Sequence, residues 1–248
     1  YQLMALLMAL NILVTVYISS EKSNPDLAIL NYKQSLLEPT KDFLERFGLK
    51  IASILILIIA TYRLTDIVMG PMANPFYIDM GYSLSEIGYV VKIVALVATI
   101  IGVFIGGIFV KRLGLYKSLL IGAFLVMFTN LSFSYASINE KNLVLLASIV
   151  ASDSLAAGIV GTVNITFLTS LVSSKYTGFQ YALLTSLMAF LGKLFGGFSG
   201  IFVESFQNLY GFSYGWMSFY IFTSCLAIPS MLMIYFNKSI FVQKNAKN

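Results

Sequence analysis

Histidine is absent from this 248-residue sequence, and Cys225 is its one cysteine. Without histidine the chain lacks the commonest general base and the commonest metal ligand, which excludes rhomboid-type serine chemistry and histidine-based zinc chemistry. A single cysteine cannot form an internal disulfide. We therefore expect no metal site, no cofactor and no enzymatic activity.

Charged residues are scarce as well, at 11% of the sequence against about 25% in an ordinary soluble domain. Hydrophobic residues make up 58%, and the mean hydropathy is +0.84. Apolar runs reach the roughly 20 residues that cross a bilayer. They occupy about 1–19, 48–69, 84–110, 114–136, 142–172, 176–203 and 213–237. This pattern predicts an all-α membrane protein with about seven transmembrane helices.

Lysine and arginine are distributed unevenly between alternate loops. Most of them lie in 20–50, in the turns near 111–117 and 175, and in the tail at 238–248, whereas the loops between these segments hold only Lys141. The positive-inside rule places the basic segments, including the carboxy terminus, in the cytoplasm. The net charge of +5 therefore reports membrane topology, and we expect the lipid bilayer as partner and no nucleic acid.

The domain organisation follows from one sizeable polar segment. The first run opens on Tyr1 without a basic leading region, so we interpret 1–19 as the last helix of an amino-terminal half that the chain lacks. A polar cytoplasmic segment follows at 20–47. The other runs form a six-helix unit at 48–237, and 238–248 is a cytoplasmic tail.

Part of the polar segment has helical character. EPTKDFLERFG places Phe43, Leu44 and Phe47 at helical spacing, with charged residues between them, before Gly48 as a stop signal. The spacing predicts a short amphipathic helix at the cytoplasmic interface. The alternative is a linker that only separates two halves of the protein.

Glycines recur four residues apart in two of the runs, in IIGVFIGGIF at 100–109 and LGKLFGGFSGIF at 191–202. Small residues at this spacing let helix backbones approach closely. The residues are Gly102, Gly106, Gly192, Gly196 and Gly200. They lie in the second helix of each of two successive trios. Two trios of opposite orientation form one half of a major facilitator transporter, the fold we expect for 48–237.

The turn within GGIFVKRLGLYKSLL, at 106–120, resembles the loop signature of the major facilitator superfamily. The matching residues are Gly107, Lys111, Arg112, Gly114 and Lys117. Glycine permits a tight turn, and the cations can dock on helix carboxy-terminal ends. Lys111 stands where the family usually has an acidic residue. An ordinary basic cytoplasmic turn is the alternative interpretation.

Five charged residues inside the apolar runs are candidate site residues, because a charge at the centre of a membrane helix costs roughly 2.5–3.5 kcal/mol on insertion scales. Helix rise places them roughly 6–15 Å from the membrane faces, near the level at which transporter sites lie. Three are cations and two are anions, which suits a substrate bearing carboxylates. They are Arg63, Asp66, Lys92, Asp153 and Lys193.

The two aspartates have different surroundings. Asp66 follows Arg63 by three residues on one helical face, so the two either form a structural pair or contribute to substrate binding or gating. Asp153 has no base on its own face and is surrounded by small residues. It is the carboxylate that we expect to bind and release protons.

Polar and aromatic residues complete the candidate set. Asn164 and Gln180 are candidates for substrate binding or gating, because a buried amide needs several hydrogen-bond partners. Isolated serines and threonines in membrane helices usually bond their own backbone. We interpret five aromatic residues as a membrane-interface belt rather than a sugar platform: Tyr77, Tyr82, Tyr89, Trp216 and Tyr220.

Three stretches resemble AmpG-type muropeptide permeases. RLTDIVMGPMANPFYIDMGYSLSEIGYVVK at 63–92 is similar to the family's seventh and eighth helices, and ASDSLAAGIVGTVNITFLTSL at 151–171 to its tenth. YTGFQYALLTSLMAFLGKLFGGFSGIFVE at 176–204 looks like its glutamine-bearing eleventh helix. The resemblance implies proton-driven import of anhydromuropeptides, which are small anionic glycopeptides, across the bacterial inner membrane for peptidoglycan recycling.

Other functions stay open at this point. The related acetyl-CoA transporters share much of this architecture, so another anionic solute is an alternative substrate. A non-transporting remnant of a split or truncated permease is a second alternative, because translocation in this fold needs two halves around a shared site. An intramembrane aspartyl protease is disfavoured, since neither LTDIV around Asp66 nor ASDSL around Asp153 has the Gly-x-Gly-Asp pattern.

Overall fold

A computed structural model of the chain describes residues 2–18 and 32–245. The chain forms two compact units, Tyr1–Thr40 and Lys41–Asn248, and the boundary between them falls inside α2. The first unit contains α1 (Gln2–Ile18), an apolar helix of 17 residues. The assignment of 1–19 to a missing half stays a prediction. Residues 19–31 of the predicted cytoplasmic segment lie outside the described residues.

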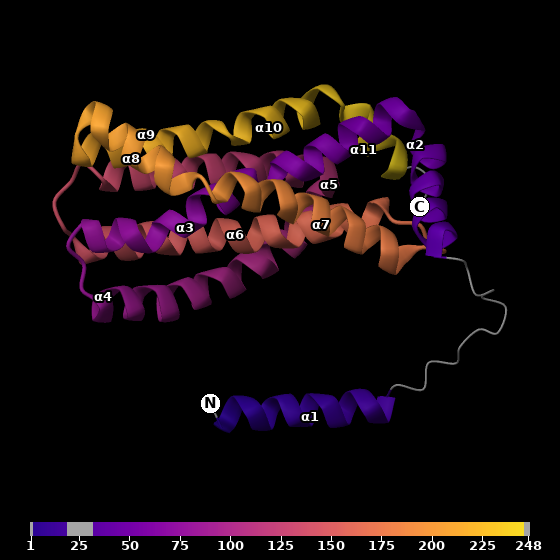
Figure 1. Ribbon diagram of the computed structural model, residues 1–248, viewed down its shortest axis with the longest axis horizontal. Helices are drawn as coiled ribbons and strands as arrows, with labels where there is room; N and C mark the ends of the chain where they lie inside the picture. The colour runs from indigo at the N-terminus through magenta and orange to yellow at the C-terminus, as the bar shows by residue number, and fades with distance from the viewer. Residues whose placement is uncertain (1, 19–31, 246–248) are drawn as a thin grey trace. The chain divides into compact units, whose positions relative to one another are not determined.

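Helices joined by short turns make up the described part of the second unit (Figure 1). After α2 (Tyr32–Tyr62) come α3 (Leu64–Asp79), α4 (Leu84–Tyr89), the π-helical segment η1 (Val90–Val94), α5 (Ala95–Ala136), α6 (Leu143–Leu171), α7 (Thr177–Gly196), α8 (Ser199–Tyr210), α9 (Phe212–Cys225), α10 (Ala227–Phe236) and α11 (Lys238–Asn245).

Five segments of the described chain are long and apolar enough to cross a membrane. The longest, Leu84–Ala136, is two helices rather than one, because Gly114 inside it has φ 78° and ψ 163°, a conformation favoured only by glycine. Gly48 breaks α2 in the same way, with φ 72° and ψ 155°. The all-α membrane fold predicted from the sequence is confirmed, and the second unit crosses back and forth between two ends.

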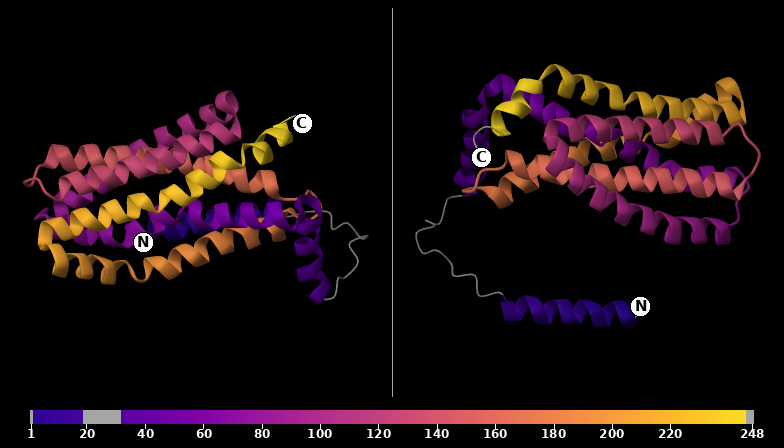
Figure 2. Two further views of the ribbon diagram at one scale, coloured as in Figure 1. Left: turned by 90° about the horizontal axis from the view of Figure 1, so that it is seen from above. Right: turned by 180° about the vertical axis from the view of Figure 1, so that it is seen from behind.

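The turns between the helices of the second unit lie at two ends of the bundle (Figures 1 and 2), and these ends differ in charge. The end that carries Gly48 and Gly114, called here the basic end, holds Lys50, Lys111, Arg112, Lys117 and Lys175. The opposite end, called here the acidic end, is formed by the turns that contain Gly81, residues 137–142 and Gly211. Its charged residues are Asp79, Glu86, Glu140, Lys141 and Glu204. Helix direction therefore alternates between the ends, as positive-inside topology requires.

Two buried clusters of apolar side chains hold the bundle together. One lies toward the basic end and includes Leu55, Ile58 and Val163. The other, toward the acidic end, is aromatic: Phe76 packs against Trp216 with ring centroids 5.3 Å apart, and Phe133 stacks on Tyr220 at 5.1 Å. Edge-to-face and stacked rings of this kind add stability beyond the area that they bury.

The predicted aromatic belt is wrong for four of its five residues. Tyr77, Tyr82, Trp216 and Tyr220 are buried in the second cluster, and only Tyr89, at 63% exposed, lies on the surface. A belt must face lipid headgroups, which a buried ring cannot do. Composition near a helix end does not reveal which side of the helix a ring occupies, and here the rings turn inward.

Glycines bring two helix pairs into close contact. A Cβ atom on Gly102 or Gly158 would overlap backbone atoms of the facing helix, and one on Gly106 would lie 2.9 Å from the Ile159 carbonyl oxygen. In α7, Gly196 approaches the Ile67 carbonyl of α3 equally closely. Gly107 and Gly200, by contrast, have no such close neighbour. The α5–α6 and α3–α7 pairs therefore depend on small residues for their spacing.

Candidate functional site

Three of the charged residues predicted from the sequence lie at or beside interruptions of helical geometry. Arg63 separates α2 from α3 and has φ −105° and ψ 7°, so the first crossing is broken there. Lys92 lies in the π-helical segment η1, and Lys193 lies in the last turn of α7, just before the break that precedes α8. Interrupted helices and π-bulges are the backbone features that transporters use around their sites.

Arg63 and Asp66 form an ion pair. The Arg63 guanidinium Nη2 lies 3.3 Å from Asp66 Oδ2, and the two side chains are 29% and 20% exposed. Asp66 is in the first turn of α3, where the amino-terminal end of the helix favours a negative charge. Arg63 Nε is buried and has no hydrogen-bond partner among the described residues, so this N–H can donate to a ligand or a water molecule.

Asp153, on α6, lies within electrostatic reach of Asp66 on α3. The Thr129 side chain of α5 is within hydrogen-bonding reach of the Asp153 carboxyl, and the charge of Asp153 also acts on Tyr77 and Tyr220. We call these five residues the carboxylate cluster. Four helices, α3, α5, α6 and α9, each contribute to it.

The structure does not bring Lys92 and Lys193 to the carboxylate cluster. Both side chains are exposed, and neither forms an ion pair within the described part of the chain. Three of the five predicted ionic residues therefore gather, and two lie on the surface. The directions in which Lys92 and Lys193 face depend on how their helices pack, with α5 on α6 and α7 on α3. Counting residues along a helix gives the depth of a side chain in the membrane and does not give that direction.

Gln180 lies at the basic end, far along α7 from the interruption near Lys193. Its Oε1 accepts hydrogen bonds from Arg46 Nη2 at 3.0 Å and from the Ser173 backbone N–H at 2.7 Å. Its Nε2 donates to Asp42 Oδ2 at 2.8 Å, and Arg46 Nε donates to the same oxygen at 2.9 Å. This network fastens residues 42–46 to the α6–α7 turn, across the end of the bundle (Figure 1).

Asn164 has a different environment, in the middle of α6. It is buried, and its Nδ2 lies 3.3 Å from the Met188 sulfur of α7. Its Oδ1 has no hydrogen-bond partner among the described residues. A buried amide oxygen without a partner is costly, so this atom is a candidate acceptor for a ligand or a water molecule.

The Gly114 turn presents its cations outward at the basic end. Lys111, Arg112 and Lys117 are all exposed, and Ser118 Oγ donates to the Gly114 carbonyl at 2.8 Å at the start of the next helix. Lys111 and Arg112 end the helix that precedes the turn, where cations are favoured.

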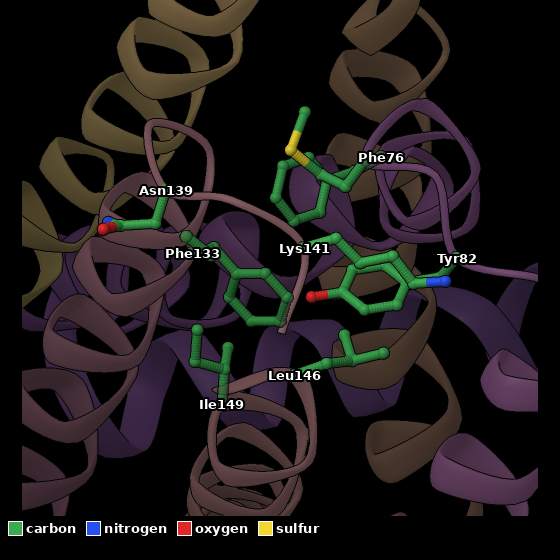
Figure 3. Close-up of a pocket in the computed structure, with 9 residues that line it drawn as sticks. Phe76, Tyr82, Phe133, Asn139, Lys141, Leu146 and Ile149 are labelled. Atoms are coloured by element: carbon green, nitrogen blue, oxygen red, sulfur yellow. The ribbon is translucent and has the colours of Figure 1, made fainter. Parts of the chain in front are cut away.

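A small pocket opens at the acidic end between α3, α5 and α6 (Figure 3). Phe76, Phe133 and Ile149 line it, and Lys141 lies over the Tyr82 ring, 5.5 Å from its centroid. Lys141 also pairs with Glu86 at 2.9 Å. The pocket is largely filled by these side chains. The contacts of Lys141 with Glu86 and Tyr82 connect the α5–α6 turn to the α3–α4 turn.

Sequence reasoning missed several residues of this arrangement. Thr129 carried no signal of its own, because a threonine in an apolar helix is ordinary, and Tyr220 was assigned to the aromatic belt rather than to the site. Trp216 donates to Asp79 Oδ2 at 3.0 Å, a contact across 137 positions that no local pattern encodes. Gly158 was missed although it packs more tightly than Gly200, because it lacks a glycine partner four residues away.

Comparison with known proteins decides the family. The family model for the Major Facilitator Superfamily matches residues 1–197. The chain belongs to the major facilitator superfamily. The second unit has six crossings within its described residues, because Gly114 divides one of the five apolar segments into two. These crossings, the interrupted first crossing and the glycine turn at 114 are therefore features of a multi-pass transporter fold.

Individual superfamily relatives carry transporter names. "Putative transporter AmpG 4" of Rickettsia felis is 29% identical over 216 residues, covering 87% of this chain and 50% of the relative. "Putative transporter AmpG 1" of Rickettsia prowazekii is 35% identical over 182 residues, covering 73% and 39%. "Anhydromuropeptide permease" of Escherichia coli is 30% identical over 236 residues, covering 94% and 45%. The chain spans about half the length of the relatives it matches.

The comparisons support an AmpG-type permease of the major facilitator superfamily, as the sequence motifs predicted. Membership in a transporter family points away from an enzyme. The relatives and the five apolar segments of the described chain indicate a multi-pass protein of the bacterial inner membrane.

Proposed function

We propose that this chain is part of a proton-coupled permease that imports anhydromuropeptides across the inner membrane for peptidoglycan recycling. The observation that carries the proposal is the 30% identity to the anhydromuropeptide permease of Escherichia coli over 94% of this chain. The carboxylate cluster supports it, because proton-coupled transport needs a buried group that can bind and release a proton.

Asp153 is the proposed proton carrier. It has no ion-pair partner in the described part of the chain, whereas Asp66 is neutralised by Arg63 at 3.3 Å. A carboxylate that no cation stabilises is more easily protonated than a paired one. The pair on α3 is then left for substrate binding or gating, with the buried Nε of Arg63 as a spare donor.

Lys92 and Lys193 are the proposed contacts for the substrate's carboxylates. Both are exposed at helix interruptions, so a ligand or a second transporter half can reach them. Sites in this fold lie between two halves that rock around them. The six crossings described here supply one side of such a site, and an amino-terminal half is the proposed partner.

Asn164 is proposed as a hydrogen-bonding residue for sugar or peptide groups, since its free Oδ1 can accept from either. Gln180 is proposed to act in gating, because it ties residues 42–46 to the α6–α7 turn. We place the basic end and the carboxy terminus in the cytoplasm, following the positive-inside rule.

Uptake into membrane vesicles tests the proposal. Vesicles that carry the complete natural protein are given labelled anhydromuropeptide, or labelled acetyl-CoA in a parallel arm, with and without a pH gradient. We expect gradient-dependent uptake of the muropeptide, its loss in Asp153→Asn, and its retention in the exposed loop control Glu140→Gln.

The alternatives give distinct results. Uptake of acetyl-CoA in place of the muropeptide would assign another anionic substrate. Absence of both, with the protein correctly inserted, would identify a non-transporting remnant. Gradient-independent uptake that survives Asp153→Asn would reject the proton carrier.

A further inference from the structure

Three cations lie close together in the chain around the Gly114 turn. Lys111, Arg112 and Lys117 fall within seven residues of sequence, and all three are exposed. The surrounding stretch, 87–139, contains no aspartate or glutamate. None of the three cations forms an ion pair within the described part of the chain. The turn therefore carries three positive charges that have no acidic partner among the described residues.

Helix α11 brings a fourth cation to the same turn. Lys238 Nζ lies 5.8 Å from the ring centroid of Tyr116, which follows Gly114 by two residues. Phe241 anchors this helix: it is buried, and its ring centroid lies 6.1 Å from that of Tyr116 and 5.8 Å from that of Phe167. The exposed Lys238 is thereby placed beside the turn. We call Lys111, Arg112, Lys117 and Lys238 the turn cluster.

Exposed apolar side chains adjoin these cations in the chain. Leu113, next to Arg112, is 39% exposed, and Phe236, two residues before Lys238 at the end of α10, is 76% exposed. Both α10 and α11 pack against α5, the helix that contains the turn. The surface at the turn cluster therefore offers positive charge and apolar area together.

The turn cluster lies at the level of lipid headgroups. Gly114 divides the apolar segment Leu84–Ala136 into two crossings, so the residues beside it are at a boundary between membrane and water. Anionic lipid headgroups at this boundary attract lysine and arginine. Asp42 and Glu45, the acidic residues of the second unit at the basic end, each pair with a cation four residues away. They do not neutralise the turn cluster.

We propose that the turn cluster binds the headgroup of an anionic phospholipid. The cations contact the lipid phosphate, and the exposed apolar side chains beside them contact the acyl chains. A soluble phosphate ester would use only the cationic part of this surface. A zwitterionic phospholipid would use both parts, but its own ammonium group would offset the attraction to the cations. The surface therefore fits a lipid with net negative charge best.

Native mass spectrometry of the purified chain in detergent tests the site, because it resolves lipids bound one at a time and requires no transport. The probes are phosphatidylglycerol and phosphatidylcholine with identical acyl chains, and glycerol phosphate as an ester without acyl chains. The variants are Lys238→Gln, Lys111→Gln and the charge-conserving Arg112→Lys. Lys50→Gln is the matched control, because it removes an exposed cation at the basic end outside the turn cluster.

We expect the first phosphatidylglycerol to bind more tightly than phosphatidylcholine. Its Kd should rise roughly fivefold in Lys238→Gln and in Lys111→Gln, because each removes one cation from the headgroup site. Arg112→Lys and the control Lys50→Gln should leave the Kd unchanged, and glycerol phosphate should not displace the lipid.

Three results would overturn the site. Equal Kd values for the two lipids would show that negative charge is not recognised. A loss in Lys50→Gln as large as that in Lys238→Gln would show diffuse attraction to the whole basic end. Displacement of the lipid by glycerol phosphate would assign the turn cluster to a soluble phosphate ester. None of these results depends on the transport activity proposed above.

Discussion

Arg63 and Asp66 show how far local spacing determines a contact. Residues three apart on a helix are neighbours, and the structure places Arg63 Nη2 3.3 Å from Asp66 Oδ2. The pair is only partly buried, so its mutual attraction is weakened by solvent. Its main effect is to compensate the charge of Asp66, which is within electrostatic reach of the second carboxylate, Asp153.

Removal of one partner therefore leaves the other charge partly buried without a compensating charge. We expect Arg63→Gln to lower the free energy of unfolding by roughly 1–3 kcal/mol, less than for a fully buried pair because both side chains retain some solvent. Thermal unfolding in detergent micelles measures the change. The double variant Arg63→Gln with Asp66→Asn should recover part of the loss. A double variant whose loss equals the sum of the single losses would show that the two residues do not interact.

At the scale of helices, two features decide the packing: glycine contacts and interrupted backbones. Gly102, Gly106 and Gly158 allow α5 and α6 to touch along their backbones. In α3, Pro71 has no N–H to donate to the Ile67 carbonyl, and Gly196 of α7 approaches that same carbonyl. The proline thus leaves a carbonyl without its helical N–H partner at the place where the backbone of α7 approaches α3.

The α5–α6 contact predicts a contrast between two glycines of one helix. A Cβ on Gly158 would overlap the Thr99 carbonyl of α5, whereas one on Gly161 would meet nothing within 4 Å. We expect Gly158→Ala to lower the free energy of unfolding by roughly 1–3 kcal/mol through overpacking. Gly161→Ala should be neutral or slightly stabilising, since alanine has the higher helix propensity. Equal unfolding temperatures for the two variants would contradict the contact.

The turn at Gly114 predicts a second contrast, between backbone strain and helix propensity. Gly114 has φ 78° and ψ 163°, a region that costs other residues of the order of 1–3 kcal/mol. Gly114→Ala should destabilise by about that amount, as measured by thermal unfolding. Gly107→Ala is the matched control, because Gly107 is helical and has open space around its Cα. A tolerated Gly114→Ala would mean that this turn is not held as described.

For the whole molecule, the distribution of charge between its ends predicts its orientation. Lysine and arginine gather at the basic end, and acidic residues predominate at the other. The asymmetry arises because each crossing places the next loop at the opposite end, so alternate loops share one end. The glycine break at 114 is essential to it, because without that break the later loops would exchange sides.

Single-cysteine labelling tests this orientation. With the exposed Cys225 replaced by serine, Lys117→Cys and Glu140→Cys place a thiol at the basic and acidic ends. An impermeant maleimide added outside intact spheroplasts should label Glu140→Cys and leave Lys117→Cys unlabelled until the membrane is permeabilised. The reverse pattern would place the basic end outside and refute the cytoplasmic carboxy terminus.

Part of the candidate site could be predicted from the sequence, and the part that could not be predicted has a physical explanation. The pairing of Arg63 with Asp66 and the turn at Gly114 involve neighbours in the chain, so residue type and spacing were sufficient. Lys92 and Lys193 were expected beside the aspartates from depth alone, yet a residue at the right depth can face any direction around its helix. Gln180 was predicted to act in substrate binding or gating, but its hydrogen-bond partner Asp42 lies 138 positions away and no local pattern predicts that contact.

The sequence by itself determined the membrane class, the glycine-permitted turns and the family, because composition, backbone freedom and motif spacing are local properties. Only the tertiary structure decided that Tyr77, Trp216 and Tyr220 turn inward and that α3, α5, α6 and α9 bring their polar residues around Asp153. In a chain that is apolar on nearly every helix face, hydrophobicity does not distinguish lipid from core. Close packing at glycines and aromatic rings makes that choice.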